Sequence, residues 1–265
     1  ELLGRFFAGA QSPILEQEFA FEMTIQPYKR GQVERIKEMC DRGVYHGAII
    51  TGVSAEEQRY LESNPCSVPA VLFNRESAVY SCVYADSYES GRKVAELFAN
   101  RGHRKVGTIV PEHLVNSENN LRFRGFVESC AMYGLELEER HIQIATMSME
   151  GGNSAARRIV EGGGGLPTAI FFPIGIMAVG ALPVFHRAAI RIPDDLEIVT
   201  YGDHEAEKYS VPSLTTVKLP VEEMAAASIR LVMELIQNPT AKPKSLVFET
   251  PFIFRESCGG FIREL

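Results

Sequence analysis

Short apolar runs alternate along the chain with segments whose apolar residues recur every three to four positions. The apolar runs predict strands at residues 3–8, 19–25, 47–51, 70–73, 82–85, 105–110, 142–145, 169–172, 197–201, 215–219 and 246–254. Strands that alternate with helical patterns are typical of βαβ units and mainly parallel sheets. The pattern therefore favours an α/β fold with two Rossmann-like lobes.

Two of the intervening helices have well-marked ends. Asp86 precedes the first, with Glu89 three residues later, a spacing that favours a capping box. Gly102 follows its last residues and can take the left-handed conformation that ends a helix. The second is predicted at 221–237, where Pro220 precedes a run of apolar residues at helical spacing.

The order of these elements predicts two lobes that share the chain. We expect residues 1–109 and 220–245 to form one lobe, and residues 110–219 and 246–265 to form the other. Several crossings between lobes would make a hinge, and a cleft between lobes is a common place for a small ligand.

Composition narrows the class of protein. The 265 residues carry a formal charge of −7, whereas a surface that binds DNA unaided is usually basic. Five scattered cysteines without metal-binding spacing fit a reduced cytoplasm better than a disulfide framework. No apolar run is long enough to span a membrane, and the N-terminus does not resemble a signal peptide.

The chain carries no recognisable catalytic motif. The glycines at 162–165 precede a predicted strand and lack the lysine of a phosphate-binding loop, so we interpret them as a turn. No nucleophile elbow is found, and the six histidines have no metal-binding spacing. His103, at a helix-to-strand junction, is expected to have a structural role. We expect neither an enzyme nor a bound metal or cofactor.

Several short motifs carry a specific likeness when they are taken in order. They are Gly-His-Arg-Lys-Val-Gly at 102–107, Arg-Phe-Arg-Gly-Phe at 122–126, the segments 167–172 and 177–181, Ile-Pro-Asp-Asp-Leu at 192–196, Pro-Ser-Leu-Thr-Thr-Val at 212–217 and Arg-Glu-Ser-Cys at 255–258. Together they resemble the effector-binding core of the lactose-repressor family of bacterial transcription regulators. The likeness covers nearly the whole chain; each motif alone is weak, but the ordered set is specific.

The resemblance implies a function. Such proteins carry a helix-turn-helix headpiece and a hinge helix ahead of this core, and neither is present in this sequence. They form homodimers in the cytoplasm, and a small-molecule effector in the cleft changes their affinity for operator DNA. A missing basic headpiece also agrees with the acidic charge of the core.

One part of the chain departs from the family. The family places a helix of about four turns between its first two strands, whereas only residues 14–18 separate Pro13 from Phe19, where the second predicted strand begins. Either residues are missing from the numbering or this helix has been lost. We favour missing residues, because loss of the helix would expose one face of a sheet.

The resemblance also indicates where an effector would bind. Arg122 matches the arginine that hydrogen-bonds the effector, and its guanidinium offers a rigid fork of donors to hydroxyls or a carboxylate. The other positions that we carry over or expect at the cleft are Ala10, Ser12, Ile14, Asn74, Asn116, Glu118, Met147, Phe172, Asp203 and Leu219.

Three polar anchors of the family are replaced in this chain. Ile174 and Gly175 stand where an Asn-Asp pair often occurs, Gly202 replaces an aspartate, and Leu219 replaces a glutamine. Asparagine and aspartate normally hold sugar hydroxyls in this family. We therefore expect a more apolar site that suits a flatter, smaller or acidic ligand, or a site that has lost its ligand.

Other interpretations remain open. Arg122 could pair with Glu118 on the surface, Asp86 could act only as a helix cap, Asp203 could bond backbone at a strand end, and Asn74 could serve a turn. The same fold would also suit a periplasmic solute-binding protein or an enzyme. An upstream helix-turn-helix would favour the regulator, and an upstream signal peptide the solute-binding protein.

Overall fold

The computed structural model describes residues 2–16, 20–29, 31–115 and 120–259. The chain divides into two compact units, Glu1–Ala85 with Pro220–Glu249 and Asp86–Leu219 with Thr250–Leu265. Each unit packs helices against a mainly parallel sheet, which confirms the α/β class. Among the described residues, no helix has the length and apolar character that crossing a membrane requires.

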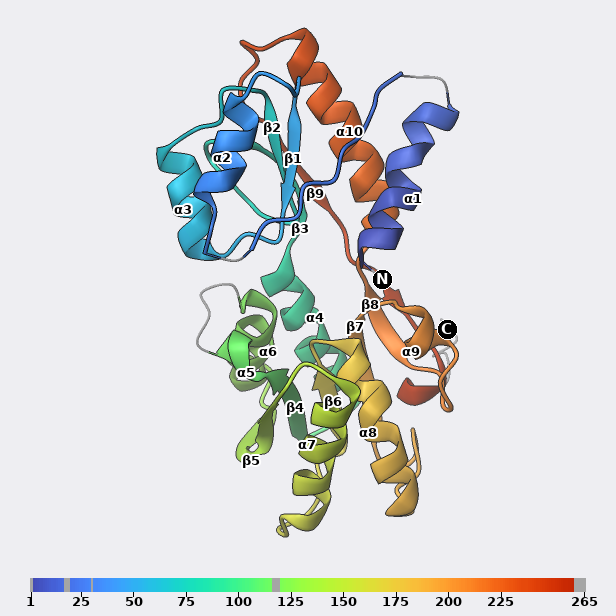
Figure 1. Cartoon of the computed structure of the whole chain (residues 1–265). Coiled ribbons are helices and arrows are strands. Elements are labelled where there is room, and N and C mark those ends of the chain that lie inside the picture. Colours follow the sequence, from blue (N-terminus) through green and yellow to red (C-terminus); the bar gives the residue numbers. More distant parts are fainter. Residues whose placement is uncertain (1, 17–19, 30, 116–119, 260–265) are drawn as a thin grey trace. The chain divides into compact units, whose positions relative to one another are not determined.

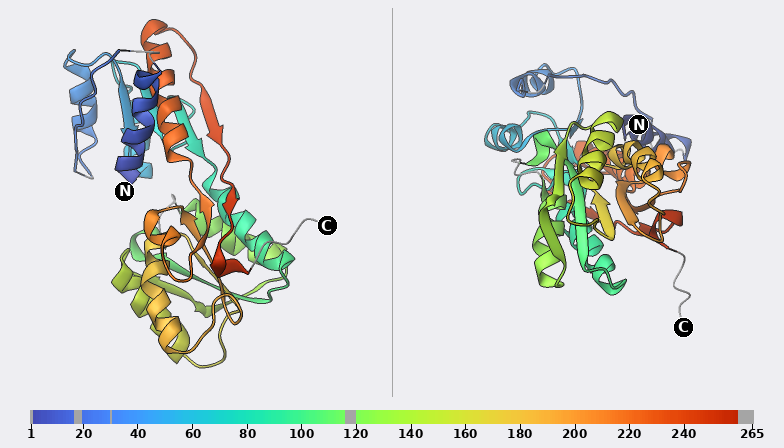
Figure 2. Two further views of the ribbon diagram at one scale, coloured as in Figure 1. Left: turned by 90° about the vertical axis from the view of Figure 1, so that its right-hand side faces the viewer. Right: turned by 90° about the horizontal axis from the view of Figure 1, so that it is seen from below.

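The first unit contains a parallel sheet. Its strand order is β1 (Ala48–Thr51), β2 (Ala70–Phe73), β3 (Ser81–Ala85) and β9 (Ser245–Phe248). Alternate residues of the strands, such as Leu72, pack with α2 (Glu34–Asp41) and α3 (Ala55–Ser63). Helix α10 (Val221–Gln237) contacts β1, β2 and β3, and α1 (Leu2–Leu15) lies beside α10 (Figures 1 and 2).

The prediction of a strand at 3–8 is wrong, because these residues belong to α1. Their apolar side chains recur at helical spacing, and the Phe6 ring packs edge-on against Phe73 of the sheet at 5.0 Å. Arg5 Nε lies 2.7 Å from the carboxylate of Glu222 on α10. The 14 residues of α1 make about four turns, the length of the helix that we expected between the first two strands. Residues 20–25 of the second predicted strand form neither helix nor strand.

The second unit contains a larger sheet. Its order is β10 (Phe252–Ile253), β8 (Thr215–Lys218), β7 (Glu197–Gly202), β6 (Ala169–Phe172), β4 (Lys105–Pro111) and β5 (Glu136–Ala145). All neighbours are parallel except β10, which runs antiparallel to β8. The central strands β6 and β7 are buried along their whole length, as expected for strands covered on both faces.

Two helical layers cover this sheet. Helices α4 (Ser87–Asn100) and α6 (Leu121–Met132) pack together, and Phe126 of α6 contacts Phe98 of α4 and Phe171 of β6 at ring distances of 6.1 and 5.1 Å. Helices α7 (Met149–Glu161) and α8 (Gly175–Arg187) pack together in a separate apolar cluster that contains Phe172. Adjacent strand residues point to opposite faces, so Phe171 and Phe172 serve different layers. The short helices α5 (Glu112–Val115) and α9 (Glu205–Lys208) and a 3₁₀ turn (Glu256–Cys258) complete the unit.

The predicted boundary between the lobes needs correction. Residues 86–109 belong to the second unit, because β4 pairs with both β5 and β6 and because α4 packs on α6. The Ser90 and Thr250 hydroxyls, 2.9 Å apart, join α4 to the final segment of the same unit. The strand predicted at 246–254 is two strands in different sheets, β9 and β10, separated by residues 249–251.

The helix ends follow the sequence closely. Asp86 accepts a hydrogen bond from the Glu89 amide at 2.9 Å, whereas the Glu89 carboxylate bonds Arg92 instead of closing a capping box. Gly102 ends α4 with φ of 85°. The bounds predicted for α10 are confirmed, and three glycines between 163 and 165 have positive φ, as a turn requires.

We expect Gly9→Ala to lower the free energy of unfolding by about 1–3 kcal/mol, as overpacking does. A Cβ atom on Gly9 would lie 2.1 Å from the carbonyl oxygen of Glu222, whereas one on Gly4 of the same helix would meet nothing within 4 Å. Gly4→Ala is therefore the control, and it should raise stability by about 0.5–1 kcal/mol. Urea denaturation of both variants measures the difference; equal effects would contradict this packing of α1 on α10.

Candidate functional site

Polar groups of the second unit gather at the carboxyl ends of its parallel strands. Pro173 follows β6, while Tyr201 and Gly202 end β7. Ligands of open α/β sheets bind at this edge, because loops and helix N-termini meet there. The carboxyl ends of these strands are therefore the candidate binding site.

Arg122 is the charged group of this edge. It is the second residue of α6, its Nη1 donates to the Pro173 carbonyl at 2.6 Å, and its guanidinium carbon lies 3.3 Å from the centre of the Tyr201 ring. Burial lowers the pKa of the guanidinium. No carboxylate of the described residues forms an ion pair with it. The aromatic face and one carbonyl stabilise the cation, and most of its N–H donors remain for another acceptor.

Three buried polar atoms accompany this cation. Arg122 Nε, Asn120 Nδ2 and the Tyr201 hydroxyl have no hydrogen-bond partner among the described residues. Asn120 stands immediately before α6, yet its side chain does not cap that helix. A buried polar group without a partner is costly, and in native proteins it often marks a place where water or a ligand binds.

Asp203 is engaged by a cation that our sequence analysis did not connect with it. It follows β7 with φ of 66° and forms an ion pair with Arg255. Arg255 also donates to the carbonyl of Leu214 at 2.8 Å. The Arg-Glu-Ser-Cys motif thus ties the end of the chain to β7 and β8, and it removes the charge of Asp203 from the edge.

Glu207 of α9 explains why residue 175 is glycine. The Glu207 side chain is fully buried, and its Oε2 accepts from Thr200 Oγ1 at 2.6 Å. Its Oε1 lies 1.8 Å from where a Cβ atom on Gly175 would be. Burial raises the pKa of this carboxyl. A carboxyl from α9 therefore fills the space beside the start of α8, a replacement that sequence spacing does not reveal.

Three further residues carried over from the family occupy different environments. Phe172 is fully buried in the cluster with α7 and α8, so its side chain serves the core instead of a ligand, and our expectation for it needs correction. Leu219 is 5% exposed. Met147 is 53% exposed, between β5 and α7.

Three positions of the first unit were expected at the cleft because a strand was predicted at residues 3–8, and that strand is not formed. Ala10, Ser12 and Ile14 were matched to a loop after a strand, but all three belong to α1. Ala10 is buried, and the Ser12 hydroxyl donates to Glu16 at 2.7 Å.

The remaining expected contacts are Asn74 in the first unit, and Asn116 and Glu118 in the segment that precedes α6. Asn74 directly follows β2 and has a φ of 57°, a conformation that asparagine tolerates in turns. Asn116 and Glu118 lie outside the described residues.

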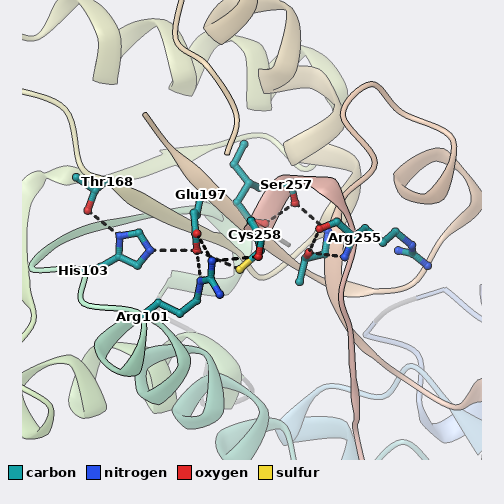
Figure 3. Close-up of polar contacts among 10 residues, drawn as sticks. Arg101, His103, Thr168, Glu197, Arg255, Ser257 and Cys258 are labelled. Atoms are coloured by element: carbon teal, nitrogen blue, oxygen red, sulfur yellow. Dashed lines mark hydrogen bonds and ion pairs between the residues drawn. The ribbon is translucent and has the colours of Figure 1, made fainter. Parts of the chain in front are cut away.

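The opposite edge of the sheet carries a buried ion-pair network (Figure 3). Glu197, at the start of β7, receives two hydrogen bonds from Arg101, at 2.7 and 2.6 Å, and lies 3.1 Å from His103 Nε2. The other ring nitrogen of His103 lies 2.9 Å from the Thr168 hydroxyl, and the Cys258 thiol donates to Glu197 at 3.1 Å. The network joins α4, β6, β7 and the end of the chain, so His103 has the structural setting that we expected.

The network determines the charge of Glu197. Burial alone would raise the pKa of this carboxyl, but hydrogen bonds from His103, Arg101 and Cys258 outweigh it and lower the pKa to about 2. Because the folded pKa lies below the unfolded value, this contribution to stability is present above about pH 4.5 and is lost as the pH falls toward 2.

We expect Glu197→Gln to remove a pH-dependent contribution on the order of 3 kcal/mol to the free energy of unfolding. Between pH 5 and pH 2 the unaltered protein should therefore lose that much more stability than the variant does. Urea denaturation at several pH values measures both slopes, with Glu161→Gln, an exposed position at the end of α7, as the control. Parallel slopes for the protein and Glu197→Gln would refute this role of the network.

Comparisons with known proteins agree with the fold and the motifs. The model of the periplasmic binding protein-like domain matches residues 95–258. A crystal structure of a LacI family transcription regulator from Clostridium acetobutylicum is 34% identical, with a TM-score of 0.88 over 96% of this chain and 94% of that one. The complex of the regulator CelR with cellobiose has a TM-score of 0.80 over 97% of this chain and 79% of that one, at 23% identity, which shows the shared fold.

The curated relatives are transcription regulators and not enzymes. An HTH-type regulator of Streptomyces limosus is 28% identical over 86% of this chain and 67% of its own length. CelR of Thermobifida fusca is 29% identical over 67% of this chain and 52% of its own length. This chain thus spans about half to two thirds of the length of such relatives. It belongs to the LacI family of transcription regulators and carries the family's periplasmic binding protein-like domain.

Proposed function

We propose that this chain is the ligand-sensing and dimerisation core of a cytoplasmic transcription regulator. A small effector binds at the Arg122 edge and changes the affinity of a homodimer for operator DNA. A helix-turn-helix segment outside the present sequence contacts the DNA. Two findings support a separate DNA-binding segment: the relatives are named HTH-type regulators, and this chain spans only part of their length. The charge of −7 agrees with a core that does not itself bind DNA.

The environment of Arg122 carries the proposal for effector binding. A guanidinium that rests on the Tyr201 ring and has no carboxylate partner among the described residues is costly to desolvate. We interpret this desolvation cost as a sign that the charge serves ligand binding. The N–H donors of a guanidinium at the carboxyl ends of parallel strands are well placed to bond the oxygens of a ligand. The alternative role for Arg122, a surface ion pair with Glu118, would not require a buried guanidinium.

Effector control then follows from linkage. An effector shifts DNA affinity only as far as it binds one conformation of the dimer better than another. We propose this as the mechanism of regulation, with the operator affinity of the full-length protein as its measure.

A thermal-shift screen tests the sensing function. The panel contains sugars, sugar acids, sugar phosphates, amino acids and purines. A specific ligand at about 100 times its Kd should stabilise the core by about 2.7 kcal/mol, which appears as a rise of several degrees in Tm. The same ligand should change retention of an operator fragment by the full-length protein, and a ligand that binds without changing retention would contradict effector control.

We expect Arg122→Met to weaken effector binding at least tenfold while the variant stays folded. The substitution removes the charged fork but keeps an apolar stem over Tyr201, and loss of a buried, unpaired charge should not lower Tm. The control is Arg124→Met on the same helix, where the arginine is exposed and pairs with Glu128. Isothermal titration of both variants compares them, and full affinity in Arg122→Met would exclude this arginine from the site.

A further inference from the structure

The polar groups left unpaired at the Arg122 edge indicate which chemistry the effector presents, an inference that rests on the proposed function. We propose that the effector carries an oxyanion, a carboxylate or a phosphate, which accepts hydrogen bonds from Arg122, Asn120 and Tyr201. This goes beyond effector binding as such, because it separates acidic ligands from the neutral sugars of the same size.

Three of the unpaired buried atoms of the edge, those of Arg122, Asn120 and Tyr201, can donate hydrogen bonds. Arg122 offers Nε–H and the N–H groups that Pro173 does not use, Asn120 offers Nδ2–H, and Tyr201 offers its hydroxyl. An arginine and an amide nitrogen cannot accept hydrogen bonds. A ligand rich in acceptors satisfies all three residues at once, whereas each hydroxyl of a neutral sugar brings a proton that also needs an acceptor.

Two acidic side chains near the carboxyl end of β7 are withdrawn from the surface or paired. Asp203 is committed to Arg255, and the ion pair cancels its charge. The Glu207 carboxyl is fully buried beside Gly175; its Oε2 accepts from Thr200, and its Oε1 is buried without a hydrogen-bond partner among the described residues. Asp203 and Glu207 thus present no free charge at the surface of the edge, whereas no described carboxylate pairs with Arg122.

The N-terminus of α6 adds to the positive potential of the same edge. Helices α6 and α8 begin beside Arg122 and Pro173, and neither has a side-chain cap. By contrast, Asp86 caps α4 and Ser148 caps α7. Free N–H groups at a helix start favour an anion, so the uncapped start of α6 reinforces the guanidinium, whereas the Glu207 carboxyl already lies beside the start of α8.

Pairs of neutral and acidic ligands, matched in size, test the proposal on the 265-residue chain. Titration calorimetry at pH 7.5 compares each of several hexoses with its uronic acid, its aldonic acid and its 6-phosphate. We expect an acidic member to bind at least tenfold more tightly than its neutral parent, with an affinity that falls as salt is raised. A preference among the acids distinguishes a carboxylate from a phosphate as the source of the oxyanion.

The other outcomes separate the two proposals. A neutral sugar that binds as tightly as its acids would overturn the oxyanion and leave effector sensing intact. If neither the acids nor the neutral sugars bind in the titrations, the oxyanion proposal is contradicted. If no ligand of the wider thermal-shift panel raises the Tm, the sensing function itself is contradicted.

A charge-placing variant tests the site residue by residue. Asn120→Asp changes a donor into a carboxylate at constant shape, so the affinity for the best acid should fall at least tenfold. Asn100→Asp, at the exposed end of α4, adds the same charge away from the site and should leave the affinity within about twofold. Unchanged acid binding in a folded Asn120→Asp protein would remove Asn120 from the site and overturn the assignment.

Discussion

The close approach of α4 and α6 is the constraint on which the candidate site depends. A Cβ atom on Gly91 would lie 2.0 Å from the Arg122 carbonyl oxygen, and one on Gly125 would lie 2.1 Å from that of Tyr88. Two glycines facing each other's backbones thus let the helices touch. This contact places the first turn of α6, with Arg122, over the end of β7. The glycine of the Arg-Phe-Arg-Gly-Phe motif is therefore a packing requirement for the arginine of the same motif.

The two edges of the second sheet have opposite chemistry. At the amino end of β7 every strong charge is matched, since Glu197 is surrounded by Arg101, His103 and Cys258. At the carboxyl end Arg122 has only an aromatic ring and a carbonyl among the described residues. A satisfied network stabilises one arrangement of the unit, whereas an unsatisfied one is stabilised by whatever binds. The proposed sensing site is thereby separated from the structural network along the strands.

Local patterns predicted the elements well where burial dominates. Strands such as β6 and the helix α10 follow directly from apolar runs and helical spacing, and Asp86 caps α4 as its residue type suggests. The pattern failed at α1, where a short apolar segment suits a strand and a helix equally and only the partner helix decides. It failed also at the lobe boundary, because nothing local to residues 105–110 indicates that β4 inserts between β5 and β6.

The candidate site shows a deeper limit of residue-by-residue comparison. The replacements at Gly175 and Gly202 suggested an apolar site, since two carboxylates of the family are absent there. In the folded chain one carboxyl returns from Glu207 of α9, buried and turned inward, and Arg255 neutralises Asp203. Each pairing joins residues distant in sequence, so spacing could not predict it. The edge that results keeps unpaired donors at Arg122, Asn120 and Tyr201, and the proposed preference for an anionic ligand rests on these donors.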